Sequence, residues 1–275
     1  MTKTTAIIFP FDNFGNAGTG AGAQLLGDFL NELLDDNDEE DRPMRGNAYT
    51  ENLFLQQVDF DSMEELADWR SEGRTRLKEA FRHDERVIWL GGNHLSVLPV
   101  YEELGGKSNL VLQFDAHLDV HQMHDVNPNP ANGNFLLHSK TAAPTVVNLG
   151  HRDLFLPAAD VKKHFAAAYS ALDVARDLNA VISDVKKRCT KAKRIWIDLD
   201  ADVFDPPAMP GVHHKLPGGL TLLMLLQVLE QIWDSEKIVG ISISEYDPAK
   251  DQEGIGANLL GWFLEWFLLK WYEAK

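Results

Sequence analysis

Short apolar runs alternate along the chain with longer segments in which apolar residues recur at helical spacing. The runs predict buried strands over 4–9, 86–90, 109–114, 145–149, 194–199 and 237–244. The helical spacing predicts helices over 24–34, 63–81, 173–189 and 222–233. Strands that are apolar along nearly their whole length, and are separated by helices, indicate a parallel sheet covered on both faces. The pattern therefore predicts one α/β domain over residues 1–275, a three-layer α/β/α arrangement with a mostly parallel sheet.

Two segments need a separate interpretation. The acidic tract DDNDEED at 35–41 carries six like charges in seven residues, which predicts a solvated loop. The apolar segment 255–272 is interrupted by Glu265 and Lys270, whereas a membrane-spanning helix needs about 20 predominantly apolar residues. We expect a terminal helix that covers the sheet, and part of its surface is an equally good candidate for a subunit interface.

Composition narrows the classes of function. The 275 residues include 26 Lys and Arg against 42 Asp and Glu, a net charge of −16, which argues against nucleic acid as a partner. The single Cys189 excludes an internal disulfide framework and fits a reducing compartment. Residues 1–10 lack the basic start and apolar run of a signal peptide, so we expect a cytoplasmic protein with no membrane partner.

Histidines and carboxylates follow four of the predicted strands. The motifs are GGNH ending at His94, DAHLD at 115–119, DADVFDP at 200–206, and EYDP beginning at Glu245. Any one such residue is more often a turn cap than a ligand, and Asp119 alone would be read that way. However, ligands of parallel sheets bind outside the carboxyl ends of the strands, so four such ends together predict a functional site.

The alternation of side chains in DAHLD can present Asp115, His117 and Asp119 on one side, and the same geometry applies to Asp200 and Asp202. Clustered carboxylates repel one another unless a cation lies between them. With His94, the donors are two imidazoles and four carboxylates, too many for one ion. A donor set rich in oxygen and without thiolate favours two Mn²⁺ ions over a structural Zn²⁺. Two ions at roughly 3.5–4 Å would activate a bridging water, which predicts a hydrolase.

The motifs resemble those of the ureohydrolase family, which contains arginases, agmatinases, guanidinobutyrases and formiminoglutamases. GGNH resembles the family's GGDH, DAHLD its DAHxD, DADVFDP its DxDxxDP, and EYDPAKD (245–251) its ExxPxxD; GHRD (150–153) and PGGLT (217–221) are also similar. The resemblance implies an arginase-like fold and a manganese hydrolase that cleaves a C–N bond of a small guanidino or formimino compound by attack of a metal-bridging hydroxide. It also implies a closed homo-oligomer, a trimer or hexamer.

Residue by residue, the resemblance implies one Mn²⁺ held by His94, Asp115, Asp119 and Asp200. The second Mn²⁺ would be held by Asp115, His117, Asp200 and Asp202, so that Asp115 and Asp200 bridge. Glu245 would receive the planar cationic group of the substrate by paired charge-assisted hydrogen bonds.

The chain departs from the family pattern at the proton-transfer residue. Where arginases and agmatinases place a histidine before a loop glycine, the segment NGNFLLH places Asn132, which cannot titrate. The substitutes considered are His121, His124, His138 and His151, and we assign the catalytic role to His138. Besides Glu245, we expect Asn132, Asn134 and His151 to contact substrate. His213 and His214 are expected on a surface loop, with contact to substrate as the less favoured alternative. Asp198 is expected beside the metal ligands.

Two other functions are also compatible with the sequence. The missing histidine also fits a metal-binding pseudoenzyme or binding module. A deacetylase-like hydrolase on a related architecture is a weaker alternative, because the paired motifs predict two metals rather than one. The sequence does not identify which guanidino or formimino compound is the substrate.

Overall fold

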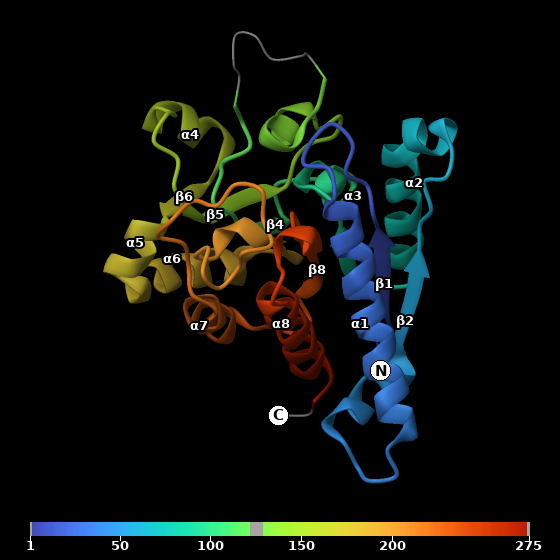
Figure 1. Ribbon diagram of the computed structural model, residues 1–275. Helices are drawn as coiled ribbons and strands as arrows, with labels where there is room; N and C mark the ends of the chain where they lie inside the picture. The colour runs from blue at the N-terminus through green and yellow to red at the C-terminus, as the bar shows by residue number, and fades with distance from the viewer. Residues whose placement is uncertain (1, 122–128, 274–275) are drawn as a thin grey trace.

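The computed structural model describes residues 2–121 and 129–273, and its centre is one sheet of eight parallel strands (Figure 1). The strand order is β2-β1-β3-β8-β7-β4-β5-β6. The strands are β1 (Thr4–Phe9), β2 (Leu53–Gln57), β3 (Arg86–Gly91), β4 (Leu110–Phe114), β5 (Thr145–His151), β6 (Ala167–Ser170), β7 (Ile195–Asp200) and β8 (Ile238–Ser244).

Helices cover both faces of this sheet, which confirms the predicted three-layer α/β/α fold. They are α1 (Thr19–Glu39), α2 (Met63–Arg82), α3 (Leu98–Leu104), α4 (Ala158–His164), α5 (Ala171–Arg176), α6 (Leu178–Lys191), α7 (Leu222–Ile232) and α8 (Ile255–Tyr272). Short 3₁₀ helices are η1 (Arg45–Ala48), η2 (Thr50–Asn52), η3 (His94–Val97), η4 (Asn132–His138), η5 (Ala201–Val203) and η6 (Pro248–Lys250).

Alternate side chains of each central strand enter two separate cores. In β3, Ile88 and Leu90 belong to the core that includes residues of α1, α5, α6, α7 and α8, whereas Val87 and Trp89 belong to the core that includes residues of α2, α3 and α4. This is the period of two that an extended chain imposes. Because both faces are covered, strands such as β3, β4 and β7 are buried at almost every position, which explains their continuous apolar runs.

The six predicted strands are present, but two strands were not predicted. β2 and β6 form the two edges of the sheet and are partly exposed. Their sequences, LFLQQ and AAYS, lack the apolar runs of the central strands because an edge strand is less completely covered. The predicted helix over 173–189 is two helices, divided at Asp177, whose carboxylate accepts a hydrogen bond from Ala180 N and caps α6.

The prediction of a solvated loop over 35–41 is wrong for residues 35–39, which continue α1 to Glu39. Asn37 in the middle of the tract is buried, and its amide donates to the Tyr49 hydroxyl at 3.3 Å. The tract therefore buries one residue, Asn37, while its acidic residues within α1 are exposed.

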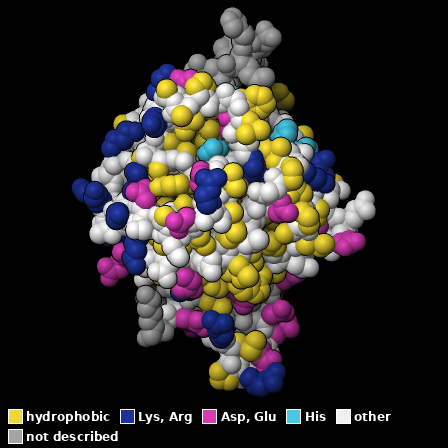
Figure 2. Space-filling view, turned by 90° about the vertical axis from the view of Figure 1, so that its left-hand side faces the viewer, with side chains coloured by type: hydrophobic (Ala, Val, Ile, Leu, Met, Phe, Trp, Pro, Cys, Tyr) yellow, Lys and Arg dark blue, Asp and Glu magenta, His cyan; other side chains and the backbone are white. Residues whose placement is uncertain are grey.

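The prediction of a helix over 255–272 is confirmed by α8, which buries Phe263 and Phe267 against the sheet. None of the helices in the described residues is long and apolar enough to cross a membrane. The covering helices still leave apolar side chains at the surface, with Leu172 64%, Leu223 71% and Trp262 49% exposed. Figure 2 shows hydrophobic side chains lying among charged ones on the side of the molecule that carries α5 to α7.

The topology brings the four predicted motifs together. The strands that precede them, β3, β8, β7 and β4, are consecutive neighbours at the centre of the sheet. Since all are parallel, their carboxyl ends meet on one side of the sheet. Asp200 is the last residue of its strand there, and Asp115, Glu245 and His94 follow their strands directly or within three residues.

Candidate active site

His94 is the centre of the first group of donors. It is the first residue of η3, and its ring is buried. Its Nδ1 lies 2.8 Å from an oxygen of Asp119, 3.2 Å from Asp200 and 3.3 Å from Asp115. The burial of the ring alone would lower the pKa of His94, but the surrounding carboxylates outweigh burial and raise it well above its ordinary value.

His117 is the centre of the second group. Its Nδ1 lies 2.9 Å from Oδ2 of Asp202 and 3.7 Å from Oδ1 of Asp115. Burial opposes the charged imidazole, yet Asp202 and Asp115 raise the pKa of His117 to about 11. Asp115 thus offers Oδ2 to the first group and Oδ1 to the second, which is the geometry of a carboxylate shared between two ions. The structure brings together all six predicted metal ligands.

Some of these donor atoms have no hydrogen-bond partner within the protein and would gain one from a bound cation. Nδ1 of His94 and Oδ2 of Asp115 are buried without a hydrogen-bond partner, a state that costs free energy in a folded protein. Burial, together with the neighbouring carboxylates, raises the pKa of Asp115 to about 7 and that of Asp200 well above its ordinary value. Two groups, His94–Asp115–Asp200 and Asp115–His117–Asp202, each present ligand atoms within 4.8 Å of one another. Oxygen and imidazole donors in this arrangement suit two divalent ions such as Mn²⁺.

Asp198 on β7 orients the first imidazole. Its Oδ2 lies 3.0 Å from Nε2 of His94 and accepts a hydrogen bond from the Tyr101 hydroxyl at 2.6 Å. Its Oδ1 accepts from the Ser242 hydroxyl at 2.6 Å, and Ser242 in turn accepts from Nε1 of Trp196 at 2.9 Å. Because Nε2 is engaged with Asp198, Nδ1 is the nitrogen that faces the carboxylates.

We expect Asp198→Asn to weaken Mn²⁺ binding by about 10–100-fold, because the replacement no longer holds the ligating imidazole as firmly. Competition against a chelator of known affinity measures the effect. Asp184→Asn is the matched control, since Asp184 on α6 bonds Tyr169 and Arg188 and is not among the predicted ligands. Equal Mn²⁺ affinity in the Asp198 variant and the wild type would contradict this role.

Glu245 lies beside the first group. Its φ of 66° is in the left-handed region, a costly conformation that is concentrated at functional sites. One carboxylate oxygen accepts from His94 N at 2.8 Å, and the other accepts from the Asn16 amide at 2.7 Å. Burial is the main reason that the pKa of Glu245 is raised to about 7, with a further contribution from Asp202. A buried carboxylate of this kind gains most from a cationic partner.

Two residues that reasoning from the sequence missed complete the surroundings. Asn16 belongs to the glycine-rich loop before α1, a pattern too common to indicate a site. Arg152, within the GHRD motif, donates to the backbone oxygens of Asp202 and Val203 at 2.7 and 2.8 Å and so fixes the turn that carries Asp202.

The glycine-rich loop is fitted closely against the site. A Cβ at Gly15 would lie 2.4 Å from Nδ2 of Asn93 and 3.2 Å from Cγ of Asn132, so only glycine allows this approach. Asn93, which replaces the aspartate of the GGDH pattern, donates to Asn13 O at 3.1 Å. Asn132 therefore lies against the same loop that supplies Asn16.

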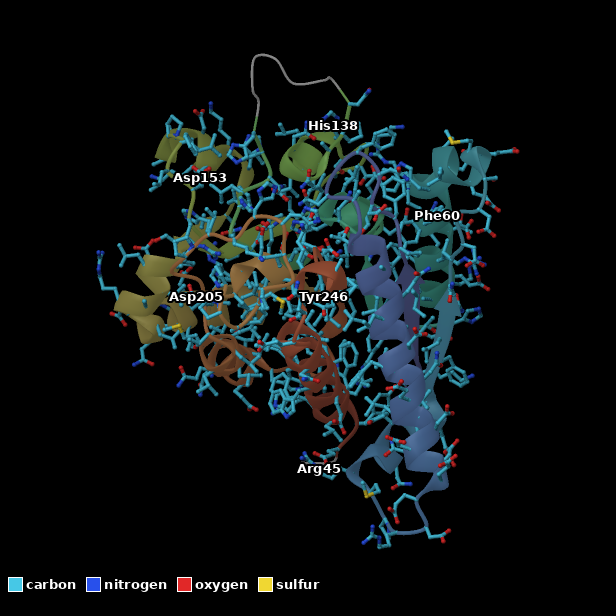
Figure 3. The ribbon with its side chains drawn as sticks, in the orientation of Figure 1. Arg45, Phe60, His138, Asp153, Asp205 and Tyr246 are labelled. Atoms are coloured by element: carbon cyan, nitrogen blue, oxygen red, sulfur yellow. The ribbon has the colours of Figure 1, made fainter. Side chains whose placement is uncertain are left out.

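The other predicted substrate and proton-transfer residues have different surroundings. Asn134 is buried, and its side chain bonds Ala131 N at 2.7 Å, within its own loop. The backbone oxygen of His138 accepts from Arg70 of α2 at 2.7 Å, and burial together with Arg70 lowers the pKa of His138 (labelled in Figure 3). Burial also lowers the pKa of His151 at the end of β5. His121 lies 3.4 Å from Asp153, and His124 lies outside the described residues.

The segment expected to be a surface loop also reaches the site. His214 is exposed, as expected, but its ring packs edge-on against the ring of His117 with centroids 5.6 Å apart. His213 is partly buried, and its Nε2 lies 3.0 Å from Oδ2 of Asp247.

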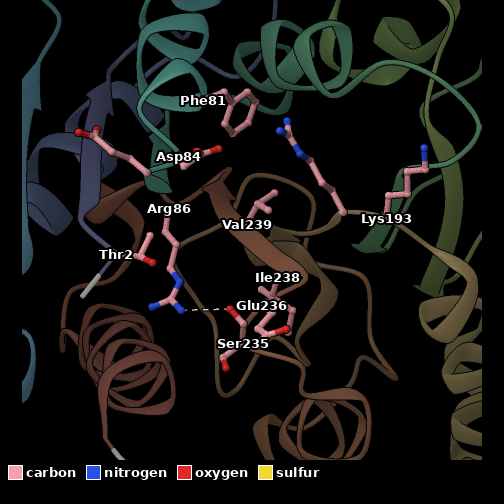
Figure 4. Close-up of a pocket in the computed structure, with 11 residues that line it drawn as sticks. Thr2, Phe81, Asp84, Arg86, Lys193, Ser235, Glu236, Ile238 and Val239 are labelled. Carbon is pink, nitrogen blue, oxygen red and sulfur yellow. Dashed lines mark hydrogen bonds between the residues drawn. The ribbon is translucent and has the colours of Figure 1, made fainter.

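A separate cavity of about 400 Å³ opens at the opposite edge of the sheet, where β3, β7 and β8 begin (Figure 4). Arg86 occupies its wall and donates to Ser235 O at 3.1 Å and Trp271 O at 3.3 Å. The guanidinium of Arg86 is thus held by backbone oxygens. The cavity is separate from the two groups of candidate metal ligands, which lie at the carboxyl ends of the strands.

Comparison with known proteins agrees with this geometry. The chain is 31% identical over 186 residues to a mitochondrial arginase of Medicago truncatula, covering 62% of this chain and 52% of the relative. It is 28% identical over 191 residues to a formimidoylglutamase of Halalkalibacterium halodurans, covering 66% and 59%. These matches span a little over half the length of the two relatives.

Solved structures show the same fold. A hypothetical agmatinase from Burkholderia thailandensis superposes with a TM-score of 0.78 at 17% identity, covering 99% of this chain and 86% of that one. The model of the arginase family matches residues 10–268, a range that includes all four strand-end motifs. With that match over nearly its whole length, and with the motifs gathered at one edge of the sheet, the chain belongs to the arginase family.

Proposed function

We propose that the protein is a Mn²⁺-dependent hydrolase that cleaves a C–N bond of a guanidino or formimino compound. The observation that supports this most directly is the pair of donor groups that share Asp115, with the buried Glu245 beside them. The first ion would be held by His94, Asp115, Asp119 and Asp200, and the second by Asp115, His117, Asp200 and Asp202. When bound, two such ions supply a Lewis acid and lower the pKa of water between them.

Glu245 binds the substrate in this proposal. Its carboxylate matches a planar amidinium, which donates two parallel N–H bonds. The hydrogen bonds from His94 N and the Asn16 amide fix the orientation of the carboxylate before substrate arrives. Asn132, Asn134 and His151 remain proposed substrate contacts, and of these Asn132 has the support of its position against the Asn16 loop.

The experiment is product analysis by mass spectrometry after Mn²⁺-loaded protein is incubated with arginine, agmatine, 4-guanidinobutyrate, guanidinopropionate and formiminoglutamate. Urea would identify a guanidino hydrolase and formamide a formimino hydrolase. We expect one of these products, and none from protein stripped of metal. Binding of two Mn²⁺ without any product from this panel would contradict the proposed substrates. It would favour the second candidate, a metal-binding module, which is supported by Asn132, a residue that cannot titrate, in place of the family's histidine.

Two further parts of the proposal concern the environment of the enzyme. We propose a closed homo-oligomer, with the exposed apolar side chains of α5, α7 and α8 as candidate contacts between subunits. A cytoplasmic location is proposed from the single cysteine, Cys189, which is free and buried in α6.

A further inference from the structure

Amidine hydrolysis needs a proton donor that the predicted residues supply poorly. When the C–N bond breaks, the leaving nitrogen takes the electron pair and must be protonated. Asn132 has no ionisable proton, and the pKa values of His138 and His151 are lowered, which favours their neutral forms. The imidazole of His138 is also close to the guanidinium of Arg70, which opposes its protonation.

The segment 211–214 connects the two sides of the candidate site. At one end, Asp247 N donates to Gly211 O at 2.7 Å, and a Cβ at Gly211 would lie 2.4 Å from the ring of Tyr246. These contacts press the segment against the residues that directly follow Glu245. At the other end, the ring of His214 packs on the ligand His117. His213 therefore belongs to a segment that contacts Tyr246 and Asp247 through Gly211 and contacts His117 through His214.

His213 has the partner that a proton-transferring histidine needs. Its Nε2 lies 3.0 Å from Oδ2 of Asp247, and both side chains are largely buried, at 24% and 7% exposed. The other oxygen of Asp247 accepts from Ala249 N at 3.0 Å, so the carboxylate is fixed in place. The contact is one of charge rather than an aligned hydrogen bond, because Nε2 of His213 is buried without a hydrogen-bond partner. A carboxylate at this distance stabilises the cation of an imidazole.

Two other ionisable residues, Lys250 and His214, lie near the pair of His213 and Asp247. Lys250 of η6 places its ammonium 3.9 Å from the same Oδ2 of Asp247. On the segment itself, His214 is the neighbouring ionisable group, and its ring faces His117. Across Asp247, Gly18 at the start of α1 approaches the carboxylate so closely that a Cβ there would lie 3.3 Å from Oδ2. The pair is thus enclosed between α1, η6 and its own segment.

We propose that His213, beside Asp247, is the general acid that protonates the leaving nitrogen; this inference rests on the proposed function. Water adds its oxygen to the amidine carbon and loses a proton, and the C–N bond breaks with its electron pair going to nitrogen. That nitrogen takes a proton from Nδ1 of His213, and the neutral imidazole regains one from bulk water. The proton lost by the attacking water balances the one that the leaving amine gains.

The test is His213→Asn, assayed with the best substrate of the product panel. We expect kcat to fall about 100-fold at neutral pH while KM changes less than about threefold, because general acid catalysis contributes roughly 10²–10⁴-fold. The kcat–pH profile of the variant should differ in shape from that of the wild type, because its general acid is missing. Free imidazole restores part of the activity. Asp247→Asn should also lower kcat, by less than His213→Asn does, because the imidazole loses the carboxylate that lies beside it.

A second readout separates catalysis from a structural effect. Arylguanidines release a weakly basic amine that needs less protonation, so the ratio of wild-type to variant kcat should shrink with these substrates. Bound Mn²⁺ per chain should stay unchanged. His83→Asn is the control, because His83 follows α2 at the opposite edge of the sheet and is exposed.

The inference is overturned if His213→Asn keeps the wild-type kcat and pH profile, if all leaving groups are affected equally, or if His138→Asn produces these effects instead. Failure of the proposed function is distinguishable, because the wild-type protein would then give no product with any amidine. If His213→Asn does not fold, His213→Gln and Asp247→Asn provide the same comparisons.

Discussion

Asp200→Ala should abolish both metal binding and turnover. Asp200 Oδ2 lies 3.2 Å from Nδ1 of His94, and its Oδ1 accepts from Asp202 N at 2.9 Å, so its loss removes a ligand and loosens the turn that carries another. Because Asp200 is a proposed ligand of both ions, we expect the bound Mn²⁺ to fall from two per chain to none after dialysis, and turnover to fall by at least about a thousand-fold. Elemental analysis of dialysed protein and the product assay measure these changes.

The metal-free protein should respond in the opposite direction. Burial, together with Asp202 and Asp115, raises the pKa of Asp200, so its charged form is unfavourable in the metal-free protein and its removal takes away that cost. Metal-free Asp200→Ala should therefore unfold at no lower temperature than metal-free wild type. Only the wild type should gain stability from Mn²⁺, by about 2.7 kcal/mol at a concentration one hundred times Kd.

The same carboxylates set the sign of the pH effect on metal binding. Since the pKa of Asp115 is raised to about 7, protons compete with Mn²⁺ below that pH, and affinity should fall as the pH falls. Asp205→Asn is the matched control, because the Asp205 side chain accepts from Gly218 N and Gly219 N and is not among the predicted ligands. A variant at Asp200 that still binds two Mn²⁺ and turns over substrate would contradict the assignment.

The sequence predicts the centre of the molecule better than its edges, for a physical reason. β3, β4, β7 and β8 are covered on both faces, and burial demands the apolar runs that identify them. Because parallel strands present their carboxyl ends together, the motifs that follow them are predictable neighbours. β2 and β6 are edges with less burial, so their sequences carry a weaker signal.

Contacts between distant segments set the limit at the site. Asn16 meets Glu245 across 229 positions of sequence, and nothing in the glycine-rich loop indicates which residue it will reach. His213 and Asp247 pair because Gly211 lets two loops come into contact, a property of the fold rather than of either loop. The ligands were predictable because pairs such as Asp200 and Asp202 lie within one motif, whereas these partners do not.

Glu245→Gln should separate a hydrolase from a metal-binding module. The replacement keeps the size of the side chain, and its amide oxygen can still accept from His94 N, while the Asn16 amide can rotate to accept from the new NH₂ group. Only the charge is lost. Breaking a buried ion pair costs about 3–5 kcal/mol, so we expect kcat/KM for a cationic amidine to fall by roughly 10²–10³-fold.

Measuring bound Mn²⁺ in the same variant distinguishes loss of substrate binding from loss of metal. Glu245 accepts its hydrogen bond from the backbone nitrogen of His94, so the side chains proposed to hold metal are left in place, and bound Mn²⁺ should match the wild type. Glu253→Gln, an exposed acid eight positions on, should leave turnover unchanged. A catalyst that places its cationic substrate on Glu245 must lose turnover while keeping its metals. A module that only holds metal has no use for that charge, so unchanged metal content together with unchanged kcat/KM in Glu245→Gln would reject the proposed role of Glu245.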